Sequence, residues 1–147
     1  MVRNVVVVDA GESIVGVYGV AEAVYTAYRG KEMIRAVLRV QEADELVTYN
    51  GNRYDLKRLS EIAAQSSRQF VLSGEHSDMQ DICWGNILGS NLYNTYVRCV
   101  GSQPPAFPET YQGSNELDVY MTHKLWQLWC ARKLMDIHGR IIPYRTA

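Results

Sequence analysis

The chain is 147 residues long and 47% hydrophobic, so it can bury a core, and we expect a single domain over residues 1–147. Its formal net charge of −1 excludes a global basic field, so binding of nucleic acid would need a local patch or metal ions. The 3 cysteines are widely spaced, which excludes a disulfide framework and a zinc-ligand pattern. No apolar run approaches the roughly 20 residues that span a bilayer. We therefore expect a soluble, cytoplasmic protein without a membrane partner.

The first third of the chain predicts three strands and a helix. Residues 5–8 are four consecutive valines, which is typical of a strand buried on both faces, and Asp9 follows them directly. Residues 13–20 and 23–28 are expected to form the next two strands. Because the connections are short, an antiparallel meander is favoured. Residues 31–43 then carry apolar positions at helical spacing and predict a helix.

The middle of the chain alternates between strand and helix. We expect a strand at 45–49, a helix at 54–65 and a short strand at 69–72. A strand that returns through a helix runs parallel to its neighbour, which predicts a mixed five-stranded α/β sheet with helices on both faces. Ligands in such sheets bind beyond the carboxyl ends of the parallel strands, where Asp9 and Asp55 are expected.

The second half of the sequence is helical in pattern. Residues 78–88, 92–100 and 116–137 each predict a helix, and the last has an apolar stripe along its length. Asp78 is expected to cap the first of these helices. Asp118 falls in the first turn expected for the last one, where an acid is favoured by the helix dipole alone.

The junction before Asp55 is the most informative local pattern. An apolar strand runs into the turn dipeptide Asn50-Gly51, and Asp55 then opens a helix. An acid at that position either caps the helix or reaches out toward a metal ion, and the pattern by itself leaves both readings open.

Three carboxylates, from Asp9, Asp55 and Asp118, stand at the ends of expected elements. If the fold brings them together, they form a cage of hard oxygens that suits Mg²⁺ or Mn²⁺. One or two such ions can activate a water and neutralise charge on a phosphoryl group, and two ions would need one shared carboxylate, for which we favour Asp9. His123 lies one and a half turns after Asp118 and is expected on a different face of the helix.

Three motifs follow one another along the chain: Asn50-Gly51-x-x-Tyr54-Asp55, His76-x-Asp78-x-x-Asp81-Ile82-Cys83-Trp84, and Asn115-x-x-Asp118-Val119-x-x-Thr122-x-x-Leu125. From Val5 to about Trp129, the chain resembles the ribonuclease H-like 3′–5′ exonucleases with four catalytic acids, the DEDD group. Within that group it is most similar to the branch related to polymerase proofreading domains and bacterial predicted exonucleases. The resemblance implies a ribonuclease H-like fold, catalysis with two metal ions, and Asp9, Asp55 and Asp118 as catalytic acids and metal ligands.

The sequence departs from that pattern at two places. The family's first motif is Asp-x-Glu, but Gly11 stands two residues after Asp9 and Glu12 follows it. Because one step along a strand reverses the face, Glu12 can act as the fourth catalytic acid only if the chain bulges or turns there. The family's third motif has a Tyr or His shortly before its acid, where this chain has Ser114 or Gly113.

Residues around Asp55 are candidates for substrate contact. We expect Asn50, Arg53, Tyr54 and Lys57 to bind a strand that leads to the metal site, since Arg53 and Lys57 could hold phosphates. Arg53 and Lys57 are explained equally well as residues on the solvent-exposed face of a helix.

The leading functional hypothesis is a metal-dependent 3′–5′ exonuclease that hydrolyses phosphodiester bonds at single-stranded DNA or RNA ends, with a role in DNA repair. A second hypothesis is a catalytically degenerate domain that binds nucleic acid or a replication or repair partner. A weaker third one is a Holliday-junction resolvase, because Asp9-x-Gly11 followed by Ile14-Val15-Gly16 is also similar to such enzymes. The sequence leaves the choice of DNA or RNA and the oligomeric state open.

Overall fold

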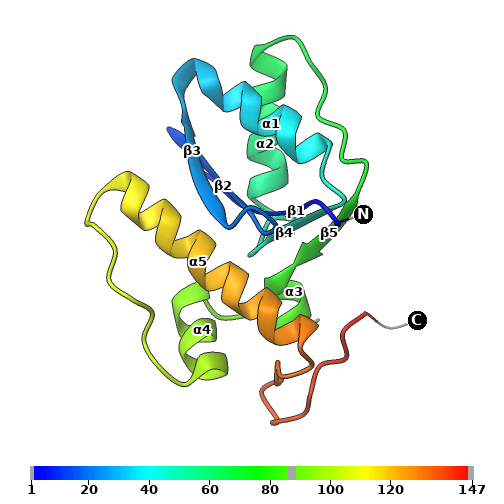
Figure 1. Ribbon diagram of the computed structural model, residues 1–147, viewed down its shortest axis with the longest axis vertical. Coiled ribbons are helices and arrows are strands. Elements are labelled where there is room, and N and C mark those ends of the chain that lie inside the picture. The colour runs from blue at the N-terminus through cyan, green and yellow to red at the C-terminus, as the bar shows by residue number, and fades with distance from the viewer. Residues whose placement is uncertain (1, 86–88, 146–147) are drawn as a thin grey trace.

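The structure is a computed structural model that describes residues 2–85 and 89–145. Its centre is a mixed five-stranded sheet with the strand order β3-β2-β1-β4-β5 (Figure 1). The strands are β1 (Val5–Ala10), β2 (Ile14–Gly19), β3 (Val24–Arg29), β4 (Glu45–Thr48) and β5 (Glu75–Asp78). The first three pair antiparallel, while β4 runs parallel to both β1 and β5. The mixed five-stranded α/β sheet expected from the sequence is therefore confirmed.

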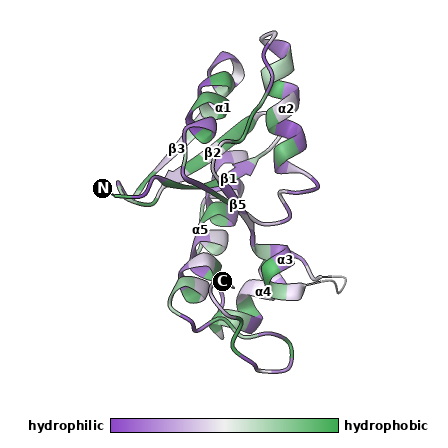
Figure 2. Ribbon diagram, turned by 90° about the vertical axis from the view of Figure 1, so that its right-hand side faces the viewer, coloured by the Kyte–Doolittle hydropathy of each residue, from purple (hydrophilic) through white to green (hydrophobic). Residues whose placement is uncertain are grey.

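Helices cover both faces of this sheet (Figures 1 and 2). On one side lie α1 and α2, and on the other lie α3, α4 and α5. The bounds are η1 (Gly30–Glu32), α1 (Met33–Gln41), α2 (Asp55–Gln65), α3 (Met79–Trp84), α4 (Leu92–Val100) and α5 (Tyr111–Cys130). Among the described residues, none of these helices is both long and apolar enough to cross a membrane.

The valines of β1 divide between two cores because successive side chains on a strand point to opposite faces. Val6 and Val8 pack in the core beneath α1 and α2, whereas Val5 and Val7 pack in the core beneath α5. By the same alternation Asp9, at the end of the strand, falls on the α5 side.

The prediction of a strand at residues 69–72 is wrong, because these residues have no regular secondary structure. Phe70 and Leu72 are apolar because they pack against the core under α1 and α2. The fifth strand is instead the polar β5, whose Ser77 donates a hydrogen bond to the buried Glu45 at 2.7 Å. Cross-strand polar pairs stabilise β5, and hydrophobic patterning could not reveal such a strand.

Helix boundaries also differ from those expected. Helix α5 begins at Tyr111, not at residue 116, because Thr110 caps it by accepting a hydrogen bond from Gly113 N at 2.9 Å, and it ends at Cys130. Asp118 therefore lies beyond the first turn, so the helix dipole does not explain an acid there. Helix α3 ends at Trp84, and the last part of the helix expected at 78–88 lies outside the described residues.

At the end of the sheet away from Asp9, the carboxylate of Glu45 is fully buried. It accepts hydrogen bonds from four segments that are distant in sequence. The donors are Arg3 at 2.7 Å, Ser77 at 2.7 Å, Trp126 at 3.1 Å and Arg145 at 2.6 Å. Because a buried charge is costly unless it is paired, the charge of Glu45 holds both terminal segments, which carry Arg3 and Arg145, against the sheet.

Candidate active site

Asp9, Asp55 and Asp118 line one cleft of about 310 Å³. The cleft lies beyond the carboxyl ends of the parallel strands β1 and β4, with α5 along one side. The remaining lining residues are Val8, Ala10, Tyr49, Asn50, Tyr54, Gln80, Asn91, Leu92 and Thr122. Three acids that are far apart in sequence thus face the same space.

Asp9 and Asp118 lie close enough for their carboxyl groups to interact directly, and when one of them is protonated it can donate a hydrogen bond to the other. Burial, followed by the negative charges of Asp55 and Asp118, raises the pKa of Asp9 to about 8. Burial also raises the pKa of Asp118. The two carboxyl groups therefore share a proton at neutral pH unless a cation replaces it.

Asp55 reaches the same cleft from the first turn of α2. Burial raises its pKa to about 7, although a hydrogen bond from the Ala10 N–H to Oδ1, at 2.7 Å, acts in the opposite direction. The N-cap of α2 is Tyr54, and no side chain makes the cap bond. Asp55 therefore ties the start of α2 to the end of β1, which is a different role from the simple cap that the sequence allowed.

The side chain of Asp78 stabilises the turn before Asp55. This carboxylate accepts hydrogen bonds from Asn50 N at 2.7 Å, Asn52 N at 3.1 Å and Gln80 N at 3.0 Å. It caps α3, as expected, and it also fixes the turn in which Asn50 adopts a φ of 63°. Because these three N–H groups occupy it, and because it does not line the cleft, Asp78 has a structural role.

Helix α5 lies close to the sheet because Gly16 has no side chain. A Cβ atom at Gly16 would lie 1.7 Å from Oδ1 of Asn115. Gly16 is also the partner of Asp9 across the β1–β2 pair. The close approach brings Asn115, and with it the face of α5 that carries Asp118, onto the end of β1.

The structure separates the other candidate residues into two groups. Asn50 and Tyr54 line the cleft, and the Tyr54 side chain is 67% exposed at its mouth. Arg53 and Lys57 are exposed and do not line it. Glu12 is also exposed, and the strand does not turn its side chain into the cleft.

Arg58 holds the backbone next to Glu12 in place. Its guanidinium donates to the carbonyl of Gly11 at 2.8 Å and to that of Glu12 at 2.7 Å. In the structure Arg58 therefore fixes the loop after β1. The position that a fourth acid would take, two residues after Asp9, is occupied by Gly11.

Sequence reasoning quoted Asn115 and Thr122 as motif positions but gave neither a role in the site, and it did not select Gln80 or Asn91. Thr122 stands one turn after Asp118 and lines the cleft, while Asn115 stands one turn before it and contacts β1. Their spacing of three and four residues places them on one helix face, which was a usable signal. Gln80 and Asn91 come from α3 and from the residue before α4, and no local pattern connects them to Asp9.

Asp9 and Asp118 supply part of the ligand set that a metal ion requires. Within residues 2–85 and 89–145, no three His, Cys, Asp or Glu side chains are grouped closely enough to hold one ion. Asp9 and Asp118 nevertheless offer hard oxygens in contact with each other. Because Mg²⁺ is commonly held by one or two carboxylates together with waters and substrate phosphates, this pair fits one such ion. The two-ion cage expected from the sequence would need further ligands.

A mixed sheet of this order, with acids from β1, α2 and α5 around one cleft, defines a ribonuclease H-like protein. A family model described as the RNase_H superfamily matches residues 9–147, and the chain belongs to that superfamily. A search of curated proteins finds no significant match.

One similar solved structure is the family B DNA polymerase from the hyperthermophilic archaeon Pyrobaculum calidifontis. The two share 16% sequence identity with a TM-score of 0.67, over 87% of this chain and 25% of the polymerase chain. This chain therefore spans about a quarter of the polymerase. At that identity, the likeness is one of fold. The ribonuclease H-like fold expected from the sequence is confirmed.

Proposed function

We propose that this chain is a metal-dependent nuclease, and more specifically a 3′–5′ exonuclease acting on single-stranded DNA or RNA ends. The observation that carries the proposal is the meeting of Asp9, Asp55 and Asp118 in one cleft, with Asp9 and Asp118 in contact. Ribonuclease H-like nucleases generally use divalent metals, and a buried pair of carboxylates has few other uses. The 3′–5′ direction and the single-strand preference rest on the motif resemblance.

Asp9 and Asp118 would hold the divalent ion in this proposal, with Asp55 beside them. When bound, Mg²⁺ or Mn²⁺ supplies Lewis acidity and neutralises the charge on a phosphate. Its double positive charge also explains why carboxyl groups with raised pKa values would ionise at neutral pH.

The remaining residues of the cleft would bind the strand. Tyr54 stands exposed at the mouth, where its ring can stack on an unpaired base. Asn50 and Gln80 bring amide groups that can donate hydrogen bonds to phosphate oxygens. Arg53 and Lys57 lie outside the cleft and are better placed to attract the strand than to position it.

A second function is favoured by the residues around the missing acid. Gly11 occupies the position of the fourth acid, Glu12 is exposed, and Ser114 is exposed and does not line the cleft. These features are consistent with a degenerate domain that binds nucleic acid or a replication or repair partner without cleaving it.

Digestion of end-labelled strands separates the two functions. Single-stranded DNA and RNA, labelled at the 3′ or at the 5′ end, would be incubated with the protein and Mn²⁺. Stepwise loss from the 3′ end that disappears in chelator and in Asp9→Asn, Asp55→Asn and Asp118→Asn supports the exonuclease. Ser114→Ala is the matched control, since Ser114 is an exposed residue on the same helix as Asp118.

Several outcomes would overturn the proposal. If Asp118→Asn cleaves as fast as wild type, the carboxylate pair is not the site. If no strand is cleaved but single strands bind, the degenerate reading is favoured. Internal cleavage of four-way junctions by a dimer would support the resolvase alternative.

A further inference from the structure

A second hollow, of about 290 Å³, lies on the opposite side of α5 from the carboxylate cleft. Two different faces of α5 line the two spaces. Asp118 and Thr122 line the cleft, whereas Glu116 and Tyr120 line the hollow. At 100° per residue these two pairs point in nearly opposite directions. The full lining is Tyr18, Tyr25, Phe107, Glu116, Val119, Tyr120, His123, Lys124 and Gln127. We call it the aromatic pocket.

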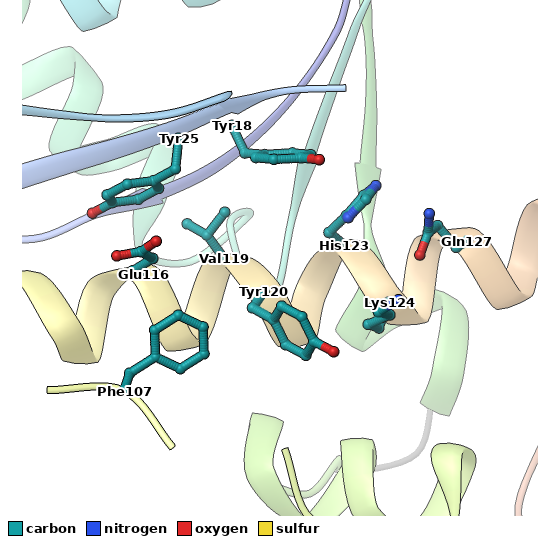
Figure 3. Close-up of a pocket in the computed structure, with 9 residues that line it drawn as sticks. All are labelled: Tyr18, Tyr25, Phe107, Glu116, Val119, Tyr120, His123, Lys124 and Gln127. Atoms are coloured by element: carbon teal, nitrogen blue, oxygen red, sulfur yellow. The ribbon is translucent and has the colours of Figure 1, made fainter. Parts of the chain in front are cut away.

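Aromatic rings form two walls of the aromatic pocket, as Figure 3 shows. Tyr18 and Tyr25 come from strands β2 and β3 on one side of α5. Phe107 and Tyr120 lie on the other side, with ring centroids 5.8 Å apart, and Val119 lies between the walls. Rings on two sides of one pocket suit a flat aromatic ligand, because offset stacking and edge contacts add to the burial of its faces.

Charged and polar groups stand at the two ends of the pocket. Glu116 lies next to Tyr25 at one end, and the pKa of Tyr25 is raised to about 12 by burial and then by the charge of Glu116. Lys124 stands near the other end, with Nζ 5.6 Å from the centre of the Tyr120 ring. Glu116 and Lys124 are eight positions apart on α5, about 12 Å along its axis.

His123 adds an unmet hydrogen-bonding group to the lining. Its Nε2 is the one buried side-chain nitrogen or oxygen without a partner in the described part of the chain. Burial lowers the pKa of His123 to about 4, so the ring is neutral at pH 7. An unpaired buried polar atom costs free energy, so the packing around His123 is not optimised for stability alone.

From this arrangement we propose that the aromatic pocket binds one nucleotide whose base carries an exocyclic amino group. The base lies between the aromatic walls, its amino group donates to the Glu116 carboxylate, and its phosphate lies toward Lys124. An alkyl chain is a poorer occupant, because it would bury Glu116 against hydrocarbon. The pocket volume is near the lower limit of the ~300–1,000 Å³ of small-molecule sites, which suits a mononucleotide.

The nucleotide comes either from solution or from a single strand, and the two sources share this chemistry. The inference does not depend on the proposed nuclease activity, because Asp118 and the aromatic pocket lie on different faces of α5. Binding is therefore measured in chelator, where metal-dependent cleavage is absent, and this separates a failure of one proposal from a failure of the other.

Calorimetric titration with CMP, with UMP and with an oligo(dC) strand tests the inference. CMP and UMP differ at the group that would face Glu116, so CMP should bind roughly tenfold more tightly, and Glu116→Gln should remove most of that preference. Loss of a stacked ring in Tyr120→Ala should weaken binding roughly 5- to 150-fold. Phe107→Leu keeps an apolar side chain and should weaken binding less. Asp118→Asn, on the other face of α5, should bind like wild type.

The source of the nucleotide follows from which ligand binds. Saturable binding of CMP assigns the pocket to a free nucleotide, and binding of oligo(dC) without CMP assigns it to a strand, provided that Tyr120→Ala weakens either one. The inference is overturned if neither ligand binds in the millimolar range. It is also overturned if Asp118→Asn abolishes binding while Tyr120→Ala and Phe107→Leu do not change it. Thermal melting of each variant shows whether it is folded.

Discussion

The side chain of Asn115 donates a hydrogen bond from Nδ2 to the backbone carbonyl of Asp9 at 2.9 Å, across 106 residues of sequence. The other end of the amide, Oδ1, accepts from the hydroxyl of Tyr25 at 2.7 Å. Asn115 thus joins α5 to both β1 and β3. Since Asp118 is one turn further along α5, this amide sets where Asp118 stands relative to Asp9.

Replacing Asn115 should therefore weaken both the fold and the site. Asn115→Ala leaves the Asp9 carbonyl and the Tyr25 hydroxyl without this partner, which should lower the free energy of unfolding by about 1–3 kcal/mol. Nuclease activity should fall further than stability explains, because Asp118 loses its support. Urea unfolding and strand digestion measure the two effects. Ser114→Ala, at the exposed neighbouring position, should change neither, and equal behaviour of both variants would contradict this role.

Stability in the absence of metal should fall as pH rises. The pKa of Asp9 is about 8 and that of Asp55 about 7 in the folded protein, against 3.8 in the unfolded chain. Between about pH 4 and pH 8 the unfolded chain has released protons that the folded protein keeps, so the free energy of unfolding decreases with pH and levels off above about 8. Asp9→Asn should show a smaller decrease.

Urea unfolding of both proteins in chelator from pH 5 to pH 9 measures this difference. Comparing the two curves cancels the titration of groups that do not contact Asp9, including His123. Parallel curves would mean that Asp9 does not carry a raised pKa.

Divalent metal should reverse this loss of stability. In the proposed function Mn²⁺ would bind the folded protein through ionised Asp9 and Asp118, so it should raise the melting temperature at pH 8 and much less at pH 5, where protons compete. Asp118→Asn should remove most of the increase. Glu61→Gln removes an exposed acid of α2 and serves as the control. An increase that persists in Asp118→Asn would place the ion elsewhere.

The missing fourth acid can be restored at Gly11. A Cβ there would lie 3.2 Å from the Ile14 carbonyl, so the backbone must yield slightly, but no unusual φ prevents the change. Gly11→Glu should tighten Mn²⁺ binding and raise the rate of digestion, whereas Gly11→Gln, of similar size, should not. Glu12→Ala should have little effect, since Glu12 is exposed outside the cleft. A large loss in Glu12→Ala would show that its side chain turns inward in solution.

Glu45 should be the most sensitive acid for stability. Glu45→Gln leaves Arg3 and Arg145 facing a neutral group, and breaking a buried ion pair typically costs about 3–5 kcal/mol. Glu75→Gln removes an exposed partner of the same arginines and should cost less than about 1 kcal/mol. Urea unfolding of the two variants gives this comparison directly. Similar costs for both would mean that Glu45 is not effectively buried.

The sequence was sufficient to predict the mixed sheet, but it did not reveal the edge strand β5. The valines of β1 and the short connections after it carry the local information that a meander needs, and the Asn50-Gly51 turn locates the start of α2. Strand β5 could not be found because its stabilising contacts are polar and cross-strand, between Ser77 and Glu45 and between His76 and Thr48. Such contacts have no period along the chain.

The candidate site shows the same limit. Asp9 and Asp55 could be selected because each follows or opens an element with a clear pattern, whereas Asp118 was selected from its motif and from a helix start expected at residue 116. The contact between Asp9 and Asp118 depends on the close approach of α5 at Gly16, and the sequence alone does not reveal which glycine serves this purpose. Glu12 illustrates the reverse case, because its proximity in sequence to Asp9 did not bring it into the cleft.

The partners of Glu45 also bear on the order in which the chain folds. They are separated from it by 42, 32, 81 and 100 residues, so most of this cluster forms through long loops whose closure costs entropy. Glu45 can pair with Arg3 as soon as β4 has been made, but its pairing with Arg145 must wait for a segment 100 residues further along the chain. The end of the sheet opposite the acidic cleft therefore cannot complete its polar cluster until the segment that carries Arg145 has been made.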